Sequence, residues 1–89
     1  MRIKSGFVLE EIAGSYIAVA VGKRAEEFHV LIRLNSTGAF LWRALEEADL
    51  SQEELVLRMT EEYSVDESIA KRDVSAFIGK IAEAGLLDE

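Results

Sequence analysis

Three short apolar segments in the N-terminal part of the chain have the length and composition of β-strands. They are rich in aromatic and β-branched residues and cover residues 7–12, 16–21 and 28–34. Ala13, Gly14 and Ser15 provide turn chemistry between the first two segments, and the polar residues 22–27 are expected to form a loop before the third. Connections this short cannot carry a parallel crossover, so the pattern predicts one antiparallel sheet.

After the third segment the apolar period changes from that of a strand to that of a helix. Asn35 and Ser36 are residue types that cap helix N-termini, because their side-chain oxygens accept free backbone N–H groups. The first helix is predicted over residues 37–47, and Gly38 near its start is expected to permit close packing against the sheet. Its apolar residues recur at helical spacing, at Ala39, Phe40, Trp42 and Leu45.

Two further helices are predicted in the C-terminal half. Ser51 and Glu54 form a capping-box pattern before the second helix, and the third begins near Asp66 and ends at Gly85, a typical C-cap residue. The expected apolar faces are Leu55, Val56, Met59 and Tyr63, then Ala70, Val74, Phe77, Ile78 and Ile81, with Leu86 and Leu87 closing the core. Three strands followed by three helices predict a single α+β domain over residues 1–89, with helices covering one face of the sheet.

Composition narrows the class of protein. The chain has 89 residues, of which 49% are hydrophobic, and contains no cysteine. It shows neither a signal-peptide pattern nor an apolar run of the roughly 20 residues that a membrane span needs, so a cytoplasmic location is expected. The net charge is −7, and residues 45–68 contain nine acidic residues against Arg58 alone. This excess disfavours nucleic-acid binding and predicts either a solvated face or a docking surface for a basic partner.

The titratable residues give little support for catalysis. His29 is the one histidine and lies inside a predicted strand, where a half-exposed structural role is favoured over that of a general base. The serines lie at predicted caps and turns, and no phosphate-binding glycine loop is present. No convergent cluster of metal ligands is visible either. The sequence therefore predicts a protein that is not an enzyme, with no catalytic residues, no cofactor and no metal site.

Two features favour binding of another chain. An edge strand of a small sheet has unpaired backbone groups, to which an extended peptide can add as a further strand. One flank of the third helix would lie beside that edge, where residues at three- and four-residue steps would form a groove with charged rims. These residues are Ile69, Asp73, Ala76, Phe77 and Lys80. Spacing alone leaves open whether Phe77 and Ile69 line such a groove or belong to the core.

A longer pattern resembles a known family. The motif Leu34-Asn35-x-Thr37-Gly38-Ala39-x-Leu41-Trp42, the segment Glu61-Glu62-Tyr63 followed by Val65-Asp66, and the C-terminal run from Asp73 to Leu87 carry the resemblance. In order and spacing they resemble the PqqD-like family, the pyrroloquinoline quinone biosynthesis protein D family. The resemblance covers nearly the whole chain and implies a winged-helix-like fold with its sheet first.

The family resemblance also implies a function. Its members bind the leader segment of a ribosomally made precursor peptide and present the peptide to a modifying enzyme, often a radical S-adenosylmethionine (SAM) enzyme. The leader adds to the third strand and lies against the third helix. Carried onto this chain, the expected peptide-binding residues are Phe28, His29, Val30, Leu31, Ile32, Arg33, Leu34, Ile69, Arg72, Asp73, Ala76, Phe77 and Lys80. Asn35, Thr37, Gly38 and Trp42 are expected to be structural.

Other hypotheses remain at this stage. A winged-helix regulator that binds nucleic acid would fit the fold, but the third helix carries Lys71, Arg72 and Lys80 against four acidic residues. A plain interaction domain without a peptide substrate is a further alternative. The expected partners are a precursor peptide and its maturase, with neither nucleic acid nor membrane, and the protein is expected to be a monomer or a homodimer.

Overall fold

Residues 1–27 and 31–88 are described by a computed structural model of the chain. The strands in this part are β1 (Arg2–Ile3), β2 (Phe7–Ile12), β3 (Ser15–Ala20), β4 (Ile32–Leu34) and β5 (Leu87–Asp88). The helices are α1 (Arg24–Glu27), α2 (Ser36–Glu47), α3 (Gln52–Tyr63) and α4 (Glu67–Glu83). The strands of the main sheet therefore precede the three long helices, as the sequence predicts.

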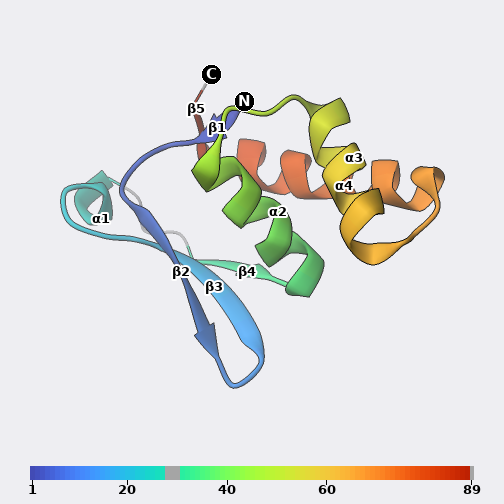
Figure 1. The fold of residues 1–89 in the computed structure, drawn as a ribbon. Coiled ribbons are helices and arrows are strands. Elements are labelled where there is room, and N and C mark those ends of the chain that lie inside the picture. Colours follow the sequence, from blue (N-terminus) through green and yellow to red (C-terminus); the bar gives the residue numbers. More distant parts are fainter. Residues whose placement is uncertain (28–30, 89) are drawn as a thin grey trace.

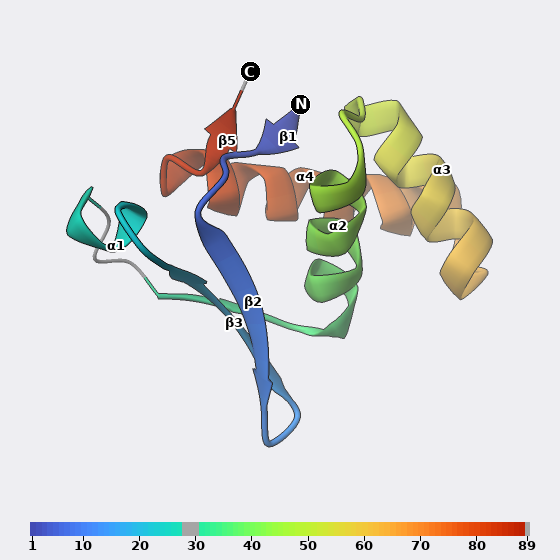
Figure 2. The same cartoon turned by 60° about the vertical axis from the view of Figure 1, so that its left-hand side comes forward.

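The main sheet is antiparallel and has the order β2-β3-β4. β2 and β3 form a hairpin in which Ile12 pairs with Ser15, so Ala13 and Gly14 make a two-residue turn. Both turn residues have positive φ, 51° at Ala13 and 82° at Gly14, as the tight turns that match strand twist require. The hairpin projects away from the helices, while β4 crosses below α2 (Figures 1 and 2).

The third strand is shorter than predicted. β4 begins at Ile32, so Leu31 lies before the strand, and 72% of its surface is exposed. An apolar composition favours a strand but does not fix how far its ladder extends, which here depends on pairing with β3. The predicted strand residues Phe28, His29 and Val30 lie outside the described residues.

The segment predicted as a loop contains a one-turn helix instead. In α1 the Arg24 side chain donates from Nη1 to Oε2 of Glu27 over 3.2 Å, and the N–H of Ala25 donates to the carbonyl of Gly22. One turn is too short to produce a helical apolar period, so the sequence pattern does not predict it.

A second small sheet joins the two ends of the chain. β1 pairs antiparallel with β5, matching Arg2 with Asp88 and Ile3 with Leu87. The marked N- and C-terminal ends accordingly lie close together (Figure 1). Strands of two residues carry no readable alternation, which is why the sequence does not predict this sheet.

The helices cover one face of the main sheet. In β4 the burial alternates, with Ile32 and Leu34 buried against the helices and Arg33 exposed on the opposite face. α2 lies over this sheet, with α4 behind it and α3 to one side (Figure 2). None of the helices in the described part of the chain combines the length and hydrophobicity of a membrane span. The fully buried large side chains include Trp42, Leu41, Leu45, Leu55, Met59, Ile81, Leu86 and Val74.

Candidate functional site

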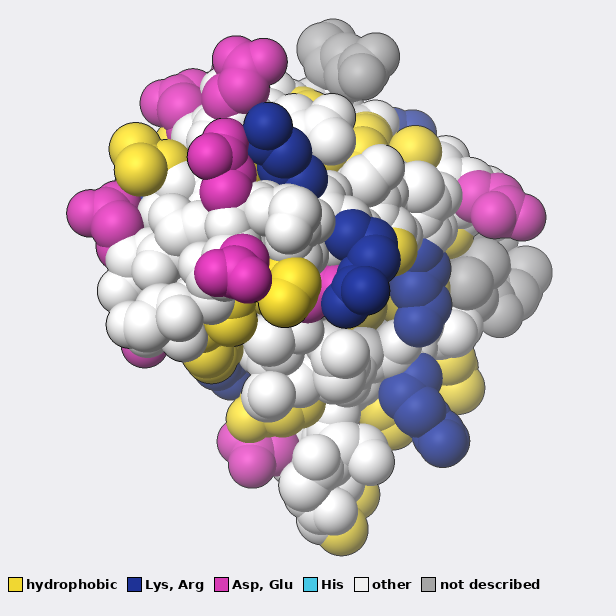
Figure 3. Space-filling view, turned by 90° about the vertical axis from the view of Figure 1, so that its right-hand side faces the viewer, with side chains coloured by type: hydrophobic (Ala, Val, Ile, Leu, Met, Phe, Trp, Pro, Cys, Tyr) yellow, Lys and Arg dark blue, Asp and Glu magenta, His cyan; other side chains and the backbone are white. Residues whose placement is uncertain are grey.

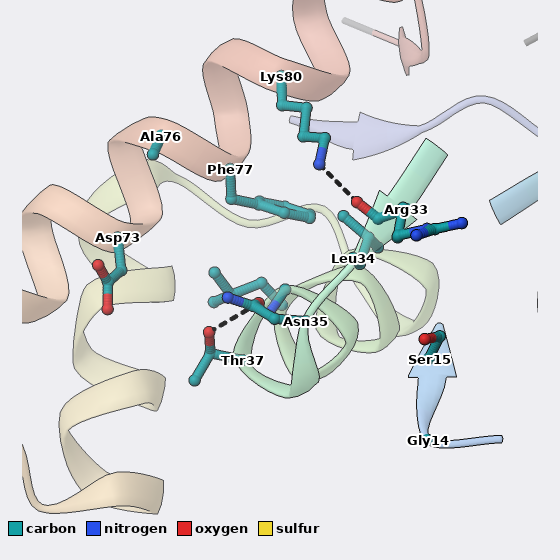
Figure 4. Close-up of a pocket in the computed structure, with 12 residues that line it drawn as sticks. Gly14, Ser15, Arg33, Leu34, Asn35, Thr37, Asp73, Ala76, Phe77 and Lys80 are labelled. Atoms are coloured by element: carbon teal, nitrogen blue, oxygen red, sulfur yellow. Dashed lines mark hydrogen bonds between the residues drawn. The ribbon is translucent and has the colours of Figure 1, made fainter. Parts of the chain in front are cut away.

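A groove of about 600 Å³ opens between the β4 edge and one flank of α4. Four segments build it: the hairpin turn, β4, the start of α2 and the middle of α4 (Figure 4). The hairpin contributes Gly14 and Ser15, and α4 contributes Asp73, Ala76, Phe77 and Lys80. Residues distant in sequence thus converge on one concave surface.

The floor of the groove is formed where β4 passes into α2. The side chain of Asn35 caps α2, because its Oδ1 accepts a hydrogen bond from the N–H of Gly38 over 2.8 Å. The hydroxyl of Thr37 donates to the same oxygen over 3.0 Å. Asn35, Thr37 and Gly38 all line the groove together with Leu34 and Leu41. The cap therefore fixes the floor at the point where the chain turns from strand to helix.

Phe77 belongs to the core and to the groove at once. Only 5% of its surface is exposed, and it packs in the same buried cluster as Leu34 and Leu41. Its ring lies between α4 and the β4–α2 junction and lines the groove (Figure 4). The two interpretations of Phe77 that the spacing left open are thus compatible, and the groove has a rigid apolar wall.

The backbone of β4 faces the groove on the side away from β3. The Lys80 side chain crosses the groove from α4, and its Nζ donates to the carbonyl of Arg33 (Figure 4). In a β-strand the N–H and the C=O of one residue point to the same side. The N–H of Arg33 therefore also faces α4, whereas Ile32 and Leu34 direct their backbone groups to β3. Among the described strands, β3 is the one partner of β4.

Opposite charges mark the two ends of the α4 flank. Lys80 lies at one end, and Asp73 lies two helical turns before it, about 10 Å away at 1.5 Å per residue. Asp73 already pairs with Arg72, whose Nε lies 3.5 Å from its Oδ1. The face of the molecule in Figure 3 shows acidic and basic side chains beside one another, not the continuous basic surface that a phosphate backbone requires.

The predicted site residues do not all meet at the groove. Arg33, Leu34, Asp73, Ala76, Phe77 and Lys80 line the groove. Leu31 and Ile32 lie beside an adjoining hollow along the same strand, while Ile69 is exposed on α4 outside both. Arg72 faces a different hollow, between α3 and α4. Phe28, His29 and Val30 are outside the described residues.

Sequence reasoning missed the groove residues at the hairpin turn and at the start of α2. The sequence pattern assigns Gly14 and Ser15 to a turn and Asn35, Thr37 and Gly38 to structural roles, and it gives Leu41 no role beyond its place in the motif. Asn35 and Gly38 do form the cap of α2, and the same two residues also form part of the floor of the groove. A capping pattern in the sequence gives no signal that the outer side of the cap faces a cavity.

The described residues of the groove include no cluster of metal-ligating side chains. Within residues 1–27 and 31–88, no group of three His, Cys, Asp or Glu side chains is placed to hold a metal ion. The hydrogen bond from the N-terminal ammonium lowers the pKa of Asp49, and the hydrogen bond from the Ser51 backbone lowers the pKa of Glu54. Both carboxylates lie away from the groove, so their lowered pKa values report local structure.

Comparison with known proteins places the chain in a family. The model of the family described as coenzyme PQQ synthesis protein D (PqqD) matches residues 25–87, well over half of the chain. The chain belongs to the PqqD family. This membership confirms the resemblance inferred from the motif around Asn35 and Trp42. No curated protein gives a significant match to this PqqD-family chain.

A solved structure agrees with this PqqD-family assignment. It shows TbiB1 in complex with the TbiA(beta) leader peptide, and TbiB1 is 27% identical to this chain. The match covers 99% of this chain and 95% of the TbiB1 chain with a TM-score of 0.74. The α+β fold predicted from the sequence, a three-stranded antiparallel sheet followed by helices, is therefore confirmed.

Proposed function

We propose that this PqqD-family protein is a non-catalytic domain that binds the leader segment of a ribosomally synthesised precursor peptide. The leader adds as a strand to the outer edge of β4 and lies against the flank of α4. The domain then holds the precursor so that the rest of the peptide reaches a modifying enzyme, such as a radical SAM maturase.

One observation carries this proposal: the edge of β4 that no other described strand covers borders an apolar groove. The C=O and N–H of Arg33 face away from β3, toward the space between β4 and α4. A peptide that adds there gains main-chain hydrogen bonds, which are independent of its sequence. The likeness to TbiB1, a leader-peptide complex, supports the same use of this fold.

Selectivity would come from the groove beside the edge. Alternate side chains of an added strand point to opposite faces, so every second residue of the leader would face Leu34, Leu41 and Phe77. The buried ring of Phe77 cannot shift without disturbing the core, which makes this wall preorganised. An apolar leader residue would therefore be anchored there without a large ordering cost.

The modifying enzyme would meet the peptide outside the groove. An extended leader advances about 3.3 Å per residue, so a segment of about ten residues is longer than α4, at roughly 25 Å. The remainder of a precursor would leave the domain at one end of the groove. The family to which the chain belongs is described by its part in coenzyme PQQ synthesis, which is consistent with a partner enzyme that modifies a peptide.

Peptide selection followed by a blocking substitution tests the proposal. Randomised peptides of about ten residues, long enough to span the groove, are displayed and selected on the wild-type domain. Binding of the selected peptides is then measured with Ala76→Trp, which places a large ring in the groove. Ala82→Trp on the same helix is the matched control, because Ala82 is exposed and does not line the groove.

We expect Ala76→Trp to weaken binding by about tenfold or more and Ala82→Trp to leave it unchanged. NMR titration of the wild-type domain should shift the signals of Ile32–Leu34 and of the α4 residues from Asp73 to Lys80. Selection that yields no binding peptide, or binding equally weakened by both substitutions, would contradict the proposed function.

A further inference from the structure

The Lys80 side chain forms a bar across the proposed binding groove. Its Nζ reaches from α4 to the carbonyl of Arg33 on β4 (Figure 4). Two hollows lie along this edge, one of about 600 Å³ toward the hairpin and one of about 350 Å³ toward the end of α4. Arg33 and Lys80 are the two residues that line both, so the bar separates what would otherwise be one groove.

This bar occupies the acceptor that an added strand would use. An incoming peptide pairs its own N–H with the outward carbonyl of Arg33, which now accepts from Lys80. The path of an extended segment along β4 also runs through the space that the Lys80 side chain fills. A peptide that adds a full strand here must therefore displace the ammonium from the carbonyl.

In the free domain no described carboxylate forms a salt bridge with the Lys80 ammonium. Glu83 lines the smaller hollow one turn further along α4, and Asp73 at the other end is held by Arg72 at 3.5 Å. This hydrogen bond is exposed, so water would replace it in part when the ammonium leaves the carbonyl, and only part of the charge-assisted interaction would be lost. A peptide carboxylate beside Arg33 would replace it.

We infer that Lys80 selects acidic leader peptides: it closes the β4 edge in the free domain and opens for a peptide that brings an Asp or Glu side chain opposite Arg33. The inference rests on the proposed function and adds the chemical class of the peptide. In the free domain the bar also protects an unpaired strand edge from pairing with other chains.

If Lys80 blocks the strand edge, the expected effect of Lys80→Met on peptide binding differs from that expected if Lys80 only attracts a negative charge. For a peptide with the carboxylate, Lys80→Met removes its new partner, and binding weakens. For the same peptide with that residue changed to its amide, Lys80→Met frees the carbonyl of Arg33 without removing an attractive partner, and binding strengthens. An attractive lysine that did not block the edge would leave the amide peptide unaffected by the substitution.

The experiment uses the same library of randomised peptides of about ten residues, selected in parallel on the wild type and on Lys80→Met. One acidic peptide from the wild-type selection and its Glu→Gln or Asp→Asn analogue are then titrated into both proteins. Lys71→Met is the control, because Lys71 lies on the same helix, pairs with Glu67 and does not line the groove.

We expect wild-type selection to enrich Asp or Glu at one position and the Lys80→Met selection to lose that enrichment. The acidic peptide should bind Lys80→Met about tenfold more weakly than the wild type, and the amide analogue about threefold more tightly. Lys71→Met should change neither.

Peptides that bind without an acidic preference, or that respond to Lys80→Met in one direction only, would overturn the role of Lys80 while leaving strand addition intact. Failure of the wild type to enrich any peptide would instead overturn the proposed function.

Discussion

The side-chain oxygen of Asn35 and the backbone N–H of Gly38 are joined by a 2.8 Å hydrogen bond that caps α2. The same oxygen would lie 3.1 Å from a Cβ atom placed on Gly38, and the Leu34 side chain would lie 3.3 Å from it. Leu34 is only 6% exposed and cannot move aside freely. The cap and the glycine thus depend on each other at the floor of the groove.

Gly38→Ala should therefore destabilise the protein, although alanine is the better helix former. The usual gain of about 1 kcal/mol is outweighed by the displacement of Asn35 and Leu34, with a net loss expected at about 1 kcal/mol. Gly79→Ala is the matched control, since that position is also helical and a Cβ atom placed there would meet no atom within 4 Å.

Gly79→Ala should raise the free energy of unfolding by about 0.5–1 kcal/mol. Urea denaturation of both variants beside the wild type measures the two effects. Equal stabilisation by the two substitutions would show that the contacts at Gly38 are loose and that the glycine is not needed there.

Ala13 in the hairpin turn is the second position where the backbone limits the side chain. Its φ of 51° lies in the left-handed region, which costs an alanine roughly 1 kcal/mol and suits asparagine better. Ala13→Asn creates an Asn-Gly turn and should stabilise the protein by about 0.5–1 kcal/mol. Thermal unfolding checks this, and Ala13→Val, which should lower the melting temperature, serves as the opposite control.

The elements predicted correctly from the sequence are those with long, regular signals. The capping box of Ser51 and Glu54 marks the start of α3, and the apolar period of α4 gives its buried face at Ala70, Val74 and Ile81. The features that were missed are short: the one-turn α1 and the two-residue strands β1 and β5. Elements of that length depend on contacts between distant parts of the chain and leave no local period.

The lining of the groove was predictable in part for a related reason. Helical spacing placed Asp73, Ala76, Phe77 and Lys80 on one flank of α4, and all four line the groove. The spacing of residues along α4 does not show which other segment of the chain faces that flank of the helix. The hydrogen bond between Lys80 and Arg33 joins residues 47 positions apart, so it appears only when the fold brings β4 beside α4.

Phe77→Ala should impair the fold and not merely the groove. With 5% of its surface exposed, Phe77 is a core residue, and its truncation should cost about 3–5 kcal/mol. A loss of peptide binding in this variant would therefore report on the fold as well as on the groove. Phe77→Leu should cost less, and urea denaturation of both variants separates the effects. A Phe77→Ala protein as stable as the wild type would contradict its place in the core.

The capping box of α3 predicts a specific dependence of stability on pH. The backbone N–H of Ser51 donates to Oε1 of Glu54 over 2.9 Å, and the Ser51 hydroxyl oxygen accepts from the N–H of Glu54 over 3.1 Å. The backbone hydrogen bond comes first and the Ser51 side chain second among the causes that lower the pKa of Glu54 below its ordinary value of about 4.5. The ionised carboxylate is thus favoured in the folded protein.

A carboxyl whose pKa is lowered by folding stabilises the protein fully above its unfolded pKa. That contribution declines as the pH falls through the folded pKa, because the unfolded chain binds the proton first. The difference in unfolding free energy between wild type and Glu54→Gln should therefore be constant at neutral pH and shrink progressively below about pH 4.5. Urea denaturation at a series of pH values from neutral to acid measures it. Glutamine keeps the acceptor oxygen but cannot titrate, so two curves that stay parallel throughout would show that Glu54 has the same pKa in both states.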